Sequence, residues 1–190
     1  MRVAFGFKAH SGWAALAVIG EKDGAPVLVD RRRVELVEEQ WAKQPYHAAE
    51  DLETQEARDL VLSGIAEAHR IALRQLKMAV QREKTRGNQV AACAVLVGTG
   101  MPSWSIDEIL AVHFRMHKAE GVLFREALTA AAAALGMDAT AIPEKELAAI
   151  GEARGILPTL AALGKSAGPP WGKDQKDAAL AALLALPRRS

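Results

Sequence analysis

The sequence predicts one α/β domain that opens with strands and then alternates helices with strands. The first 40 residues are short apolar runs separated by turn signals, with no helical stripe. Residues 90–97 are continuously apolar and stand between two long helical patterns, which is typical of a parallel strand covered on both faces. The length of 190 residues suits a single core, so we expect one domain spanning residues 1–190.

Three antiparallel strands are predicted at residues 3–7, 13–19 and 27–37. Ser11 and Gly12 mark the first turn, and Asp23 and Gly24 mark the second. An Asp-Gly pair between two apolar runs is a strong hairpin signal, because it supplies the positive φ angles that a tight turn needs.

The rest of the chain reads as helices and short strands. Residues 54–84 carry apolar side chains at spacings of three and four, which predicts a helix. Ser105 and Glu108 form a capping box that starts a second helix, expected to run to residue 135 and to be about 45 Å long. A strand at 140–142, helical residues at 144–163 broken near Pro158, and a helix at 174–186 complete the order β-β-β-α-β-α-β-α-α.

Composition excludes several classes of protein. The formal net charge is +1, so nucleic-acid binding would need a local basic patch. The single cysteine, Cys93, lies in an apolar run, which excludes a disulfide framework and favours a buried, inert thiol. No stretch approaches the roughly 20 apolar residues of a membrane span. Lys8 and His10 interrupt the first apolar run, so we find no secretory signal and expect a cytoplasmic protein.

Two segments resemble a known family. Residues 174–181, DQKDAALA, are similar to the D-x-x-D-A-x-x-A segment of crossover-junction endodeoxyribonucleases of the RuvC type, and residues 5–12 are similar to the first strand and turn of that family. The element order is also that of ribonuclease H-like domains. The resemblance implies a ribonuclease H-like mixed sheet, and it implies that Asp174 and Asp177 are the catalytic carboxylates, which bind divalent metal.

The chain departs from the family pattern at two places. Lys8 stands where the family has an aspartate in the first strand, and residues 95–98 give no acid at the end of the fourth strand. Glu50, Glu53 and Glu56 lie near the start of the first helix, but no motif fixes them. Two-metal hydrolysis needs several convergent carboxylates. We therefore expect a degenerate active site without standard nuclease activity.

A ligand site is expected where the parallel strands end. In α/β sheets, ligands bind beyond the carboxyl ends of the strands. This edge should gather the start of the last helix with five candidate ligand-binding residues: Lys8, His10, Gly98, Thr99 and Gly100. The Gly-Thr-Gly loop is either an anion site that feeds a helix N-terminus or a plain turn. Asp174 either caps the last helix or binds metal or substrate.

A second cluster is predicted on the helix that starts at residue 106. His113, His117 and Glu120 follow spacings of four and three, which places them on one face. They share that face with Phe124 and other apolar residues, so we expect them to be at least half buried. Three readings stay open: a hydrogen-bond network between helices, a site for Zn²⁺ or another transition metal, and a histidine that contacts substrate.

Three hypotheses for function follow. The first is a module without nuclease activity that binds nucleic acid or a protein partner. The second is a divergent metal-dependent hydrolase that acts on a phosphodiester or nucleotide through Asp174 and Asp177, helped by His117 and Glu120. The third is a structural homodimer formed through the second long helix at His113, His117 and Gly121. Divalent-metal binding separates the second hypothesis from the others.

Overall fold

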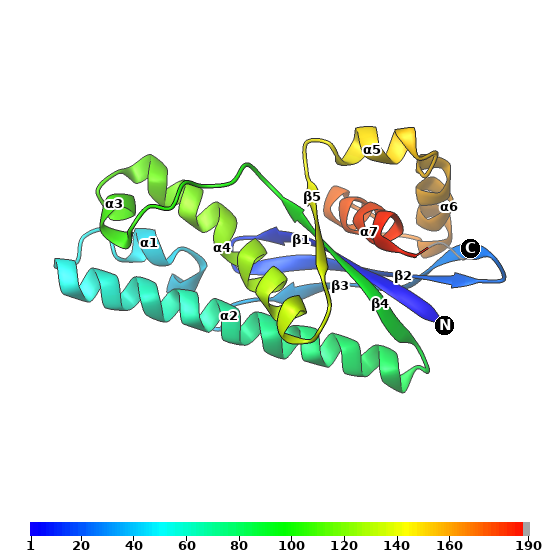
Figure 1. Ribbon diagram of the computed structural model, residues 1–190, viewed down its shortest axis with the longest axis horizontal. Helices are drawn as coiled ribbons and strands as arrows, with labels where there is room; N and C mark the ends of the chain where they lie inside the picture. Colours follow the sequence, from blue (N-terminus) through cyan, green and yellow to red (C-terminus); the bar gives the residue numbers. More distant parts are fainter. Residues whose placement is uncertain (188–190) are drawn as a thin grey trace.

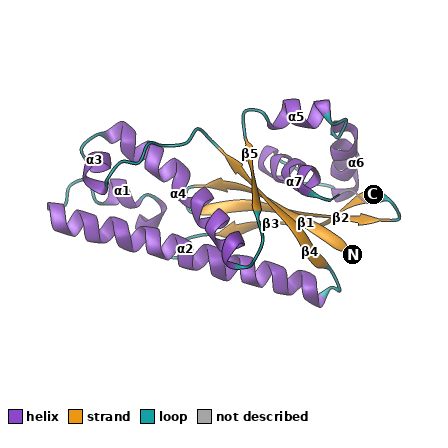
Figure 2. Ribbon diagram, in the orientation of Figure 1, coloured by secondary structure: helices purple, strands orange, loops and turns teal. Residues whose placement is uncertain are grey.

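The computed structural model describes residues 1–187 as a five-stranded mixed sheet flanked by helices (Figures 1 and 2). The strands lie in the order β3-β2-β1-β4-β5. The first three pair antiparallel, whereas β4 pairs parallel to β1 and to β5. Their bounds are β1 Arg2–His10, β2 Trp13–Lys22, β3 Ala25–Glu35, β4 Gln89–Val97 and β5 Ala139–Pro143. The predicted α/β class and mixed sheet are confirmed.

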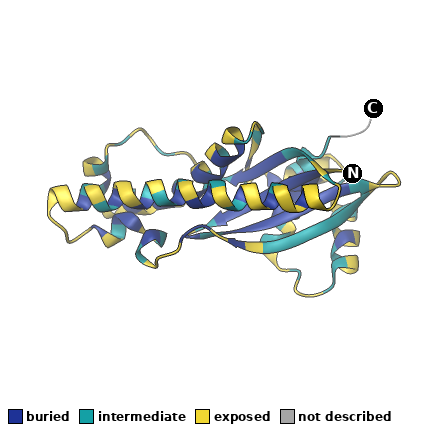
Figure 3. Ribbon diagram, turned by 90° about the horizontal axis from the view of Figure 1, so that it is seen from below, coloured by how far each residue is buried: buried dark blue, intermediate teal, exposed yellow. Residues whose placement is uncertain are grey.

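The helices divide between the two faces of the sheet. Their bounds are α1 Pro45–Ala48, α2 Thr54–Thr85, α3 Ile106–Leu110, α4 His113–Ala134, α5 Leu147–Ala153, α6 Leu157–Ala167 and α7 Lys173–Ala185, with a 3-10 turn at Trp41–Lys43. Helices α2 and α4 cover one face, and α7, flanked by α5 and α6, covers the other (Figure 1). The outer side of α2 faces solvent (Figure 3).

Strand β1 supplies side chains to both faces because successive residues point in opposite directions. Val3, Phe5 and Phe7 are buried in the core beneath α2 and α4. Ala4 belongs to the second core cluster, which is formed with α7. Lys8 follows the same alternation and therefore points toward α7, which makes it a charged residue on a buried face.

Gly6 lets α7 lie directly on β1. A Cβ atom added at Gly6 would stand 1.9 Å from the carbonyl oxygen of Ala178 and 2.6 Å from the amide nitrogen of Ala182. The helix presents mostly alanine at this contact, so its backbone comes close to the strand. This approach fixes where the acidic first turn of α7 meets the end of β1.

The second long helix differs from the prediction. It is broken into α3 and α4 at Val112, whose backbone is extended with a φ of −141°. His113 and His117 are exposed, so the expectation of burial is wrong for these two residues, whereas Glu120 is buried as expected. The break changes the direction of the chain, and α4 turns only its later face, which includes Phe124, toward the main core.

The region between β3 and α2 is not a plain loop. It contains the short helix α1, whose Tyr46 is buried in a cluster with Val61 of α2 and Met116 of α4. This packing holds the α1 segment against the outer ends of the two long helices. Residues 188–190 lie outside the described residues.

Within residues 1–187, no single helix is long and apolar enough to cross a membrane. Helices α5 and α6 pass that test only as a pair, by length and composition, and they are bent by 107° relative to each other.

Candidate functional site

Lys8 lies at the centre of a group of carboxylates. Its Nζ atom donates a hydrogen bond of 2.7 Å to Oδ2 of Asp177, and it lies 3.0 Å from Oε1 of Glu144 and 3.3 Å from Oδ1 of Asp174. The Lys8 side chain is only 7% exposed. One ammonium group therefore contacts three carboxylates from two parts of the chain.

Strand ends bring Lys8 and Glu144 together. Glu144 directly follows β5, and its amide donates to the carbonyl oxygen of Val97 over 2.8 Å, which continues the parallel ladder by one residue. Strand β4 lies between β5 and β1 in the sheet, so the ends of all three strands meet at this edge. Glu144 reaches across that edge to Lys8.

The turn before α7 positions the two aspartates. Arg31 of β3 donates hydrogen bonds of 3.0 Å to the carbonyl oxygens of Ala167 and Gly168. At the start of α7, the amide of Gly172 donates to Oε1 of Gln175 over 2.8 Å. The helix begins at Lys173, so Asp174 does not cap it; the capping interpretation is wrong, and the Asp174 carboxylate is turned toward the strand ends instead.

Further cations surround the three carboxylates. Nζ of Lys173 donates to Oδ2 of Asp177 over 2.5 Å, and Nη2 of Arg125 lies 3.6 Å from Oε2 of Glu144. Nε2 of His10 lies 3.2 Å from Oδ2 of Asp174, and the His10 ring stacks on Trp13 with 4.3 Å between ring centroids. Lys8, Lys173 and Arg125 together match the charge of the carboxylates.

The contact between Lys8 and Asp177 favours the charged form of both side chains. Burial alone would lower the pKa of Lys8, but its hydrogen bonds to Asp177 and Glu144 raise that pKa above the usual lysine value. Burial alone would raise the pKa of Asp177, but hydrogen bonds from Lys173 and Lys8 hold it below the usual value. Both groups are therefore charged at neutral pH.

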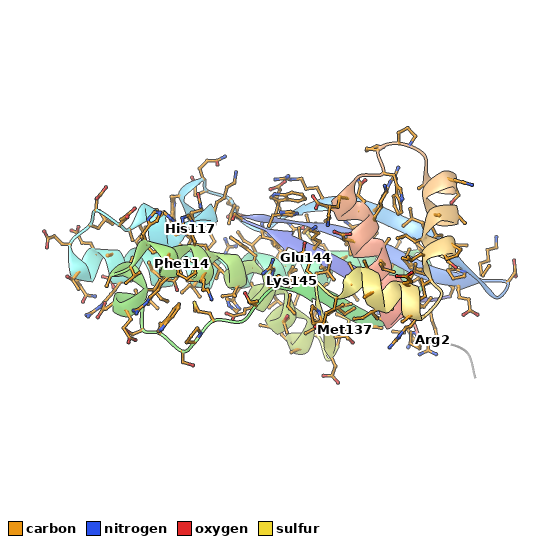
Figure 4. All side chains as sticks on the ribbon, turned by 90° about the horizontal axis from the view of Figure 1, so that it is seen from above. Arg2, Phe114, His117, Met137, Glu144 and Lys145 are labelled. Carbon is orange, nitrogen blue, oxygen red and sulfur yellow. The ribbon has the colours of Figure 1, made fainter. Side chains whose placement is uncertain are left out.

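A basic cleft of about 510 Å³ opens beside the Lys8 cluster. Four cationic side chains line it, and Glu144 is the one acid among the lining residues. The four cations are Lys118, Arg125, Lys145 and Lys173. Glu144, Lys145 and His117 are seen on the same side of the molecule (Figure 4). The cleft is shaped by α4 and by the chain that follows β4 and β5.

The Gly98–Gly100 loop has a smaller part in this site than the sequence suggests. Gly98 and Thr99 line the basic cleft, and Gly100 does not. The loop does not feed a helix directly, because α3 begins only at Ile106. Ser105 and Glu108 form the predicted capping box, in which the Ser105 hydroxyl accepts from the Glu108 amide and the Glu108 carboxylate accepts from the Ser105 amide. The loop and the start of α3 are therefore separate features of the chain.

The predicted His113, His117 and Glu120 cluster gains a member from α1. Among residues 1–187, the ring nitrogens of His47, His113 and His117 form a group within 4.8 Å of one another. Glu120 is buried, and its Oε2 lies 2.7 Å from Nδ1 of His47. Glu120 therefore contacts His47, one histidine of the group, through Nδ1 of its ring.

No protein-family model and no curated protein matches this sequence. Solved structures do match. Thermus thermophilus RuvC in complex with a Holliday junction substrate aligns over 96% of this chain and 91% of its own, with a TM-score of 0.52 and 14% identity. The chain has a RuvC-like ribonuclease H fold. A second Thermus thermophilus RuvC structure aligns over 95% of this chain and 91% of its own, with 15% identity and a TM-score of 0.47.

On this RuvC-like fold, the structure brings Lys8, His10, Asp174 and Asp177 together at the edge where the sequence places them. One functional candidate, Glu144, is absent from the sequence prediction, and a second, His47, is predicted only as part of the loop before the first long helix. The sequence pattern assigns Glu144 to the start of a helix. Only its position directly after a parallel strand indicates that it is a site residue. His47 lies in an irregular segment, and no spacing rule connects it to α4.

Proposed function

We propose that this chain is a RuvC-like module without nuclease activity that binds nucleic acid through the basic cleft. The observation that carries the proposal is the Lys8 ammonium, which lies within 3.3 Å of three carboxylates at the end of β1. The resemblance places metal-binding carboxylates at Asp174 and Asp177. Both already contact a cation that belongs to the chain.

A divalent ion would be disfavoured among these carboxylates. Two-metal hydrolysis uses acidic side chains to neutralise and hold two cations that contact the attacking and leaving oxygens. Here Lys8, Lys173 and Arg125 neutralise the same acids. Because like charges repel strongly at contact distance when they are partly buried, an incoming Mg²⁺ would be opposed by the Lys8 ammonium.

The cleft offers cations that are free to contact phosphates. Lys118 and Lys145 line it, and neither forms an ion pair within residues 1–187. A cleft lined by four cations and one acid attracts a polyanion. One Thermus thermophilus RuvC structure of this fold is a complex with a Holliday junction substrate, which makes branched DNA the first ligand to test.

The binding experiment measures the affinity of the protein for fluorescent four-way junction, duplex and single-stranded DNA in EDTA at several salt concentrations. We expect Lys118→Ala with Lys145→Ala to weaken binding and to flatten the salt dependence, by about one unit of slope for each lost phosphate contact. The matched control is Lys77→Ala with Lys84→Ala, since both residues are exposed on α2. Equal loss in the two double variants would contradict the cleft as the binding surface.

The second experiment incubates the same DNA with Mg²⁺ or Mn²⁺. We expect no cleavage by the wild type. Cleavage that is lost in Asp174→Asn and Asp177→Asn would overturn the proposal and establish the divergent metal-dependent hydrolase instead. Binding of no nucleic acid at all would leave a protein partner as the ligand.

The homodimer through the second helix stays a prediction. The break at Val112 shortens the helix that was expected to run without interruption from residue 106 to residue 135, while His113 and Gly121 remain exposed on α4. Light scattering coupled to size-exclusion chromatography at micromolar concentration tests it, with His117→Ala expected to weaken any dimer.

A further inference from the structure

Three histidine rings converge on the side of α4 that faces α1. His47 belongs to α1, while His113 and His117 lie one turn apart at the start of α4. The ring centroids are 4.5 Å apart for His47 and His117, 5.0 Å for His47 and His113, and 4.6 Å for the pair on α4. The three rings thus form a compact triangle built from two separate segments.

The orientation of His47 is set from behind by a buried carboxylate. Oε2 of Glu120 lies 2.7 Å from Nδ1 of His47, and Oε1 accepts a hydrogen bond of 3.1 Å from the backbone amide of His47. Gln44 donates to the same carboxylate over 3.3 Å. With Nδ1 occupied as a donor to a carboxylate, Nε2 carries the lone pair.

That lone pair has no partner within the described part of the chain. Nε2 of His47 is buried and makes no hydrogen bond there. Buried polar atoms are nearly always paired, because an unpaired one loses its interaction with water and gains nothing in return. A cation bound at Nε2 would satisfy it.

His113, at the surface, also has a carboxylate near its Nδ1 atom. Its Nδ1 lies 3.3 Å from Oε1 of Glu50, and its Nε2 lies 3.1 Å from Nε2 of His117. Two nitrogens bound to one tetrahedral ion at 2.0–2.1 Å are about 3.3 Å apart. The separation in the structure is close to that value.

We propose that His47, His113 and His117 form a binding site for a transition-metal ion of the Zn²⁺ class. Imidazole nitrogens suit Zn²⁺, Co²⁺, Ni²⁺ and Cu²⁺, whereas Mg²⁺ and Ca²⁺ prefer oxygen ligands. Glu120 and Glu50 orient two of the ligands, as carboxylates commonly do behind metal-bound histidines. This set replaces Glu120 of the sequence prediction by His47 as the third ligand.

Three protein ligands leave a fourth position of the ion open to solvent. His113 and His117 are exposed, and His117 also lines the basic cleft. The open position therefore adjoins the cleft, where water or an anion would complete a tetrahedron. The site is separate from the carboxylates around Lys8 and does not depend on nucleic-acid binding.

The test uses untagged, EDTA-treated, dialysed protein without DNA. Isothermal titration with Zn²⁺ should show one ion per chain in the wild type, and Co²⁺ should give the intense visible absorption of a tetrahedral site. His117→Ala and His113→Ala should each abolish both signals. His69→Ala is the matched control, since His69 is a histidine of α2 outside the group, and it should bind like the wild type.

The following controls distinguish the loss of a metal ligand from misfolding. His113 and His117 are exposed, so their removal leaves no cavity, and circular dichroism should be unchanged. Glu120→Gln retains all three ligands and should weaken Zn²⁺ binding about 10–100-fold. Zn²⁺ should raise the melting temperature of the wild type and not that of His117→Ala. Absence of Zn²⁺ binding in the wild type, or binding that survives both histidine substitutions, would overturn the proposal.

Discussion

Lys8 and Asp177 are 169 residues apart in the chain, and their side chains meet over 2.7 Å between β1 and α7. The contact joins a strand at the centre of the sheet to the last helix of the chain. Asp177 is 17% exposed in its side chain and Lys8 is 7% exposed, so water screens the pair only weakly. This pair is the basis of the first three predictions.

Lys8→Met should destabilise the protein. The substitution leaves three carboxylates facing each other without their central cation, which is costlier than losing a surface ion pair. We expect a loss on the order of 2–3 kcal/mol, since part of the group remains open to solvent. Urea unfolding measures it, with Lys22→Met on the exposed end of β2 as the control.

Lys8→Asp should create a divalent-metal site. The variant would place four carboxylates around the position of the former ammonium, and Mn²⁺ would relieve their repulsion. We expect Mn²⁺ binding and a rise in melting temperature that the wild type does not show. Electron paramagnetic resonance counts the bound ions. If a folded Lys8→Asp and a folded Lys8→Ala both fail to bind Mn²⁺, the carboxylates are not arranged as metal ligands.

The stabilising contribution of Asp177 should disappear in acid. Its pKa in the folded protein lies below the ordinary aspartate value of 3.8, so folding favours the ionised form. The contribution is complete above that ordinary value and is lost as the pH falls through the lower folded value. The free energy of unfolding of wild type and Asp177→Asn should therefore converge as the pH falls below about 4. A difference that stays constant down to acid pH would contradict this linkage.

Gly6→Ala should separate α7 from the sheet. The added methyl would collide with backbone atoms of α7, which cannot move aside as a side chain can. We expect a loss of more than about 3 kcal/mol, measured by urea unfolding. Gly121→Ala is the control. No atom lies within 4 Å of a Cβ there, and alanine favours a helix, so that variant should be unchanged or about 0.5–1 kcal/mol more stable.

Cys93 should be unreactive in the native protein. The residue is fully buried in β4, and burial raises the pKa of its thiol to about 12. Only the thiolate attacks a disulfide reagent, so its colour reaction at about pH 8 should appear only after denaturant is added. Rapid reaction of the folded protein would show that β4 opens locally.

The sequence was sufficient to predict the sheet but not to predict every site residue. Alternation along β1 and the motif at the start of α7 locate Lys8, Asp174 and Asp177, because both are local patterns. Predicting Glu144 as a site residue depends on where β5 is predicted to end. An error of one residue in that boundary assigns Glu144 to a helix instead of a strand end. His47 lies on the short helix α1, which tertiary packing holds against α2 and α4, and no local pattern in the sequence places it beside His113 and His117.

The contact between β1 and α7 can form only late in the synthesis of the chain. Lys8 emerges from the ribosome with β1, whereas Asp174 and Asp177 emerge only after all five strands have been made. Until then, the face of the sheet that includes Ala4, Ala15, Ala17 and Ile19 has no cover from α7. Contacts between such distant residues form slowly because the intervening chain must first be ordered. The growing chain therefore exposes an apolar sheet face with a lysine at its rim until α7 has been made. An exposed apolar sheet face is prone to aggregation, so this is the interval in which the chain most needs protection.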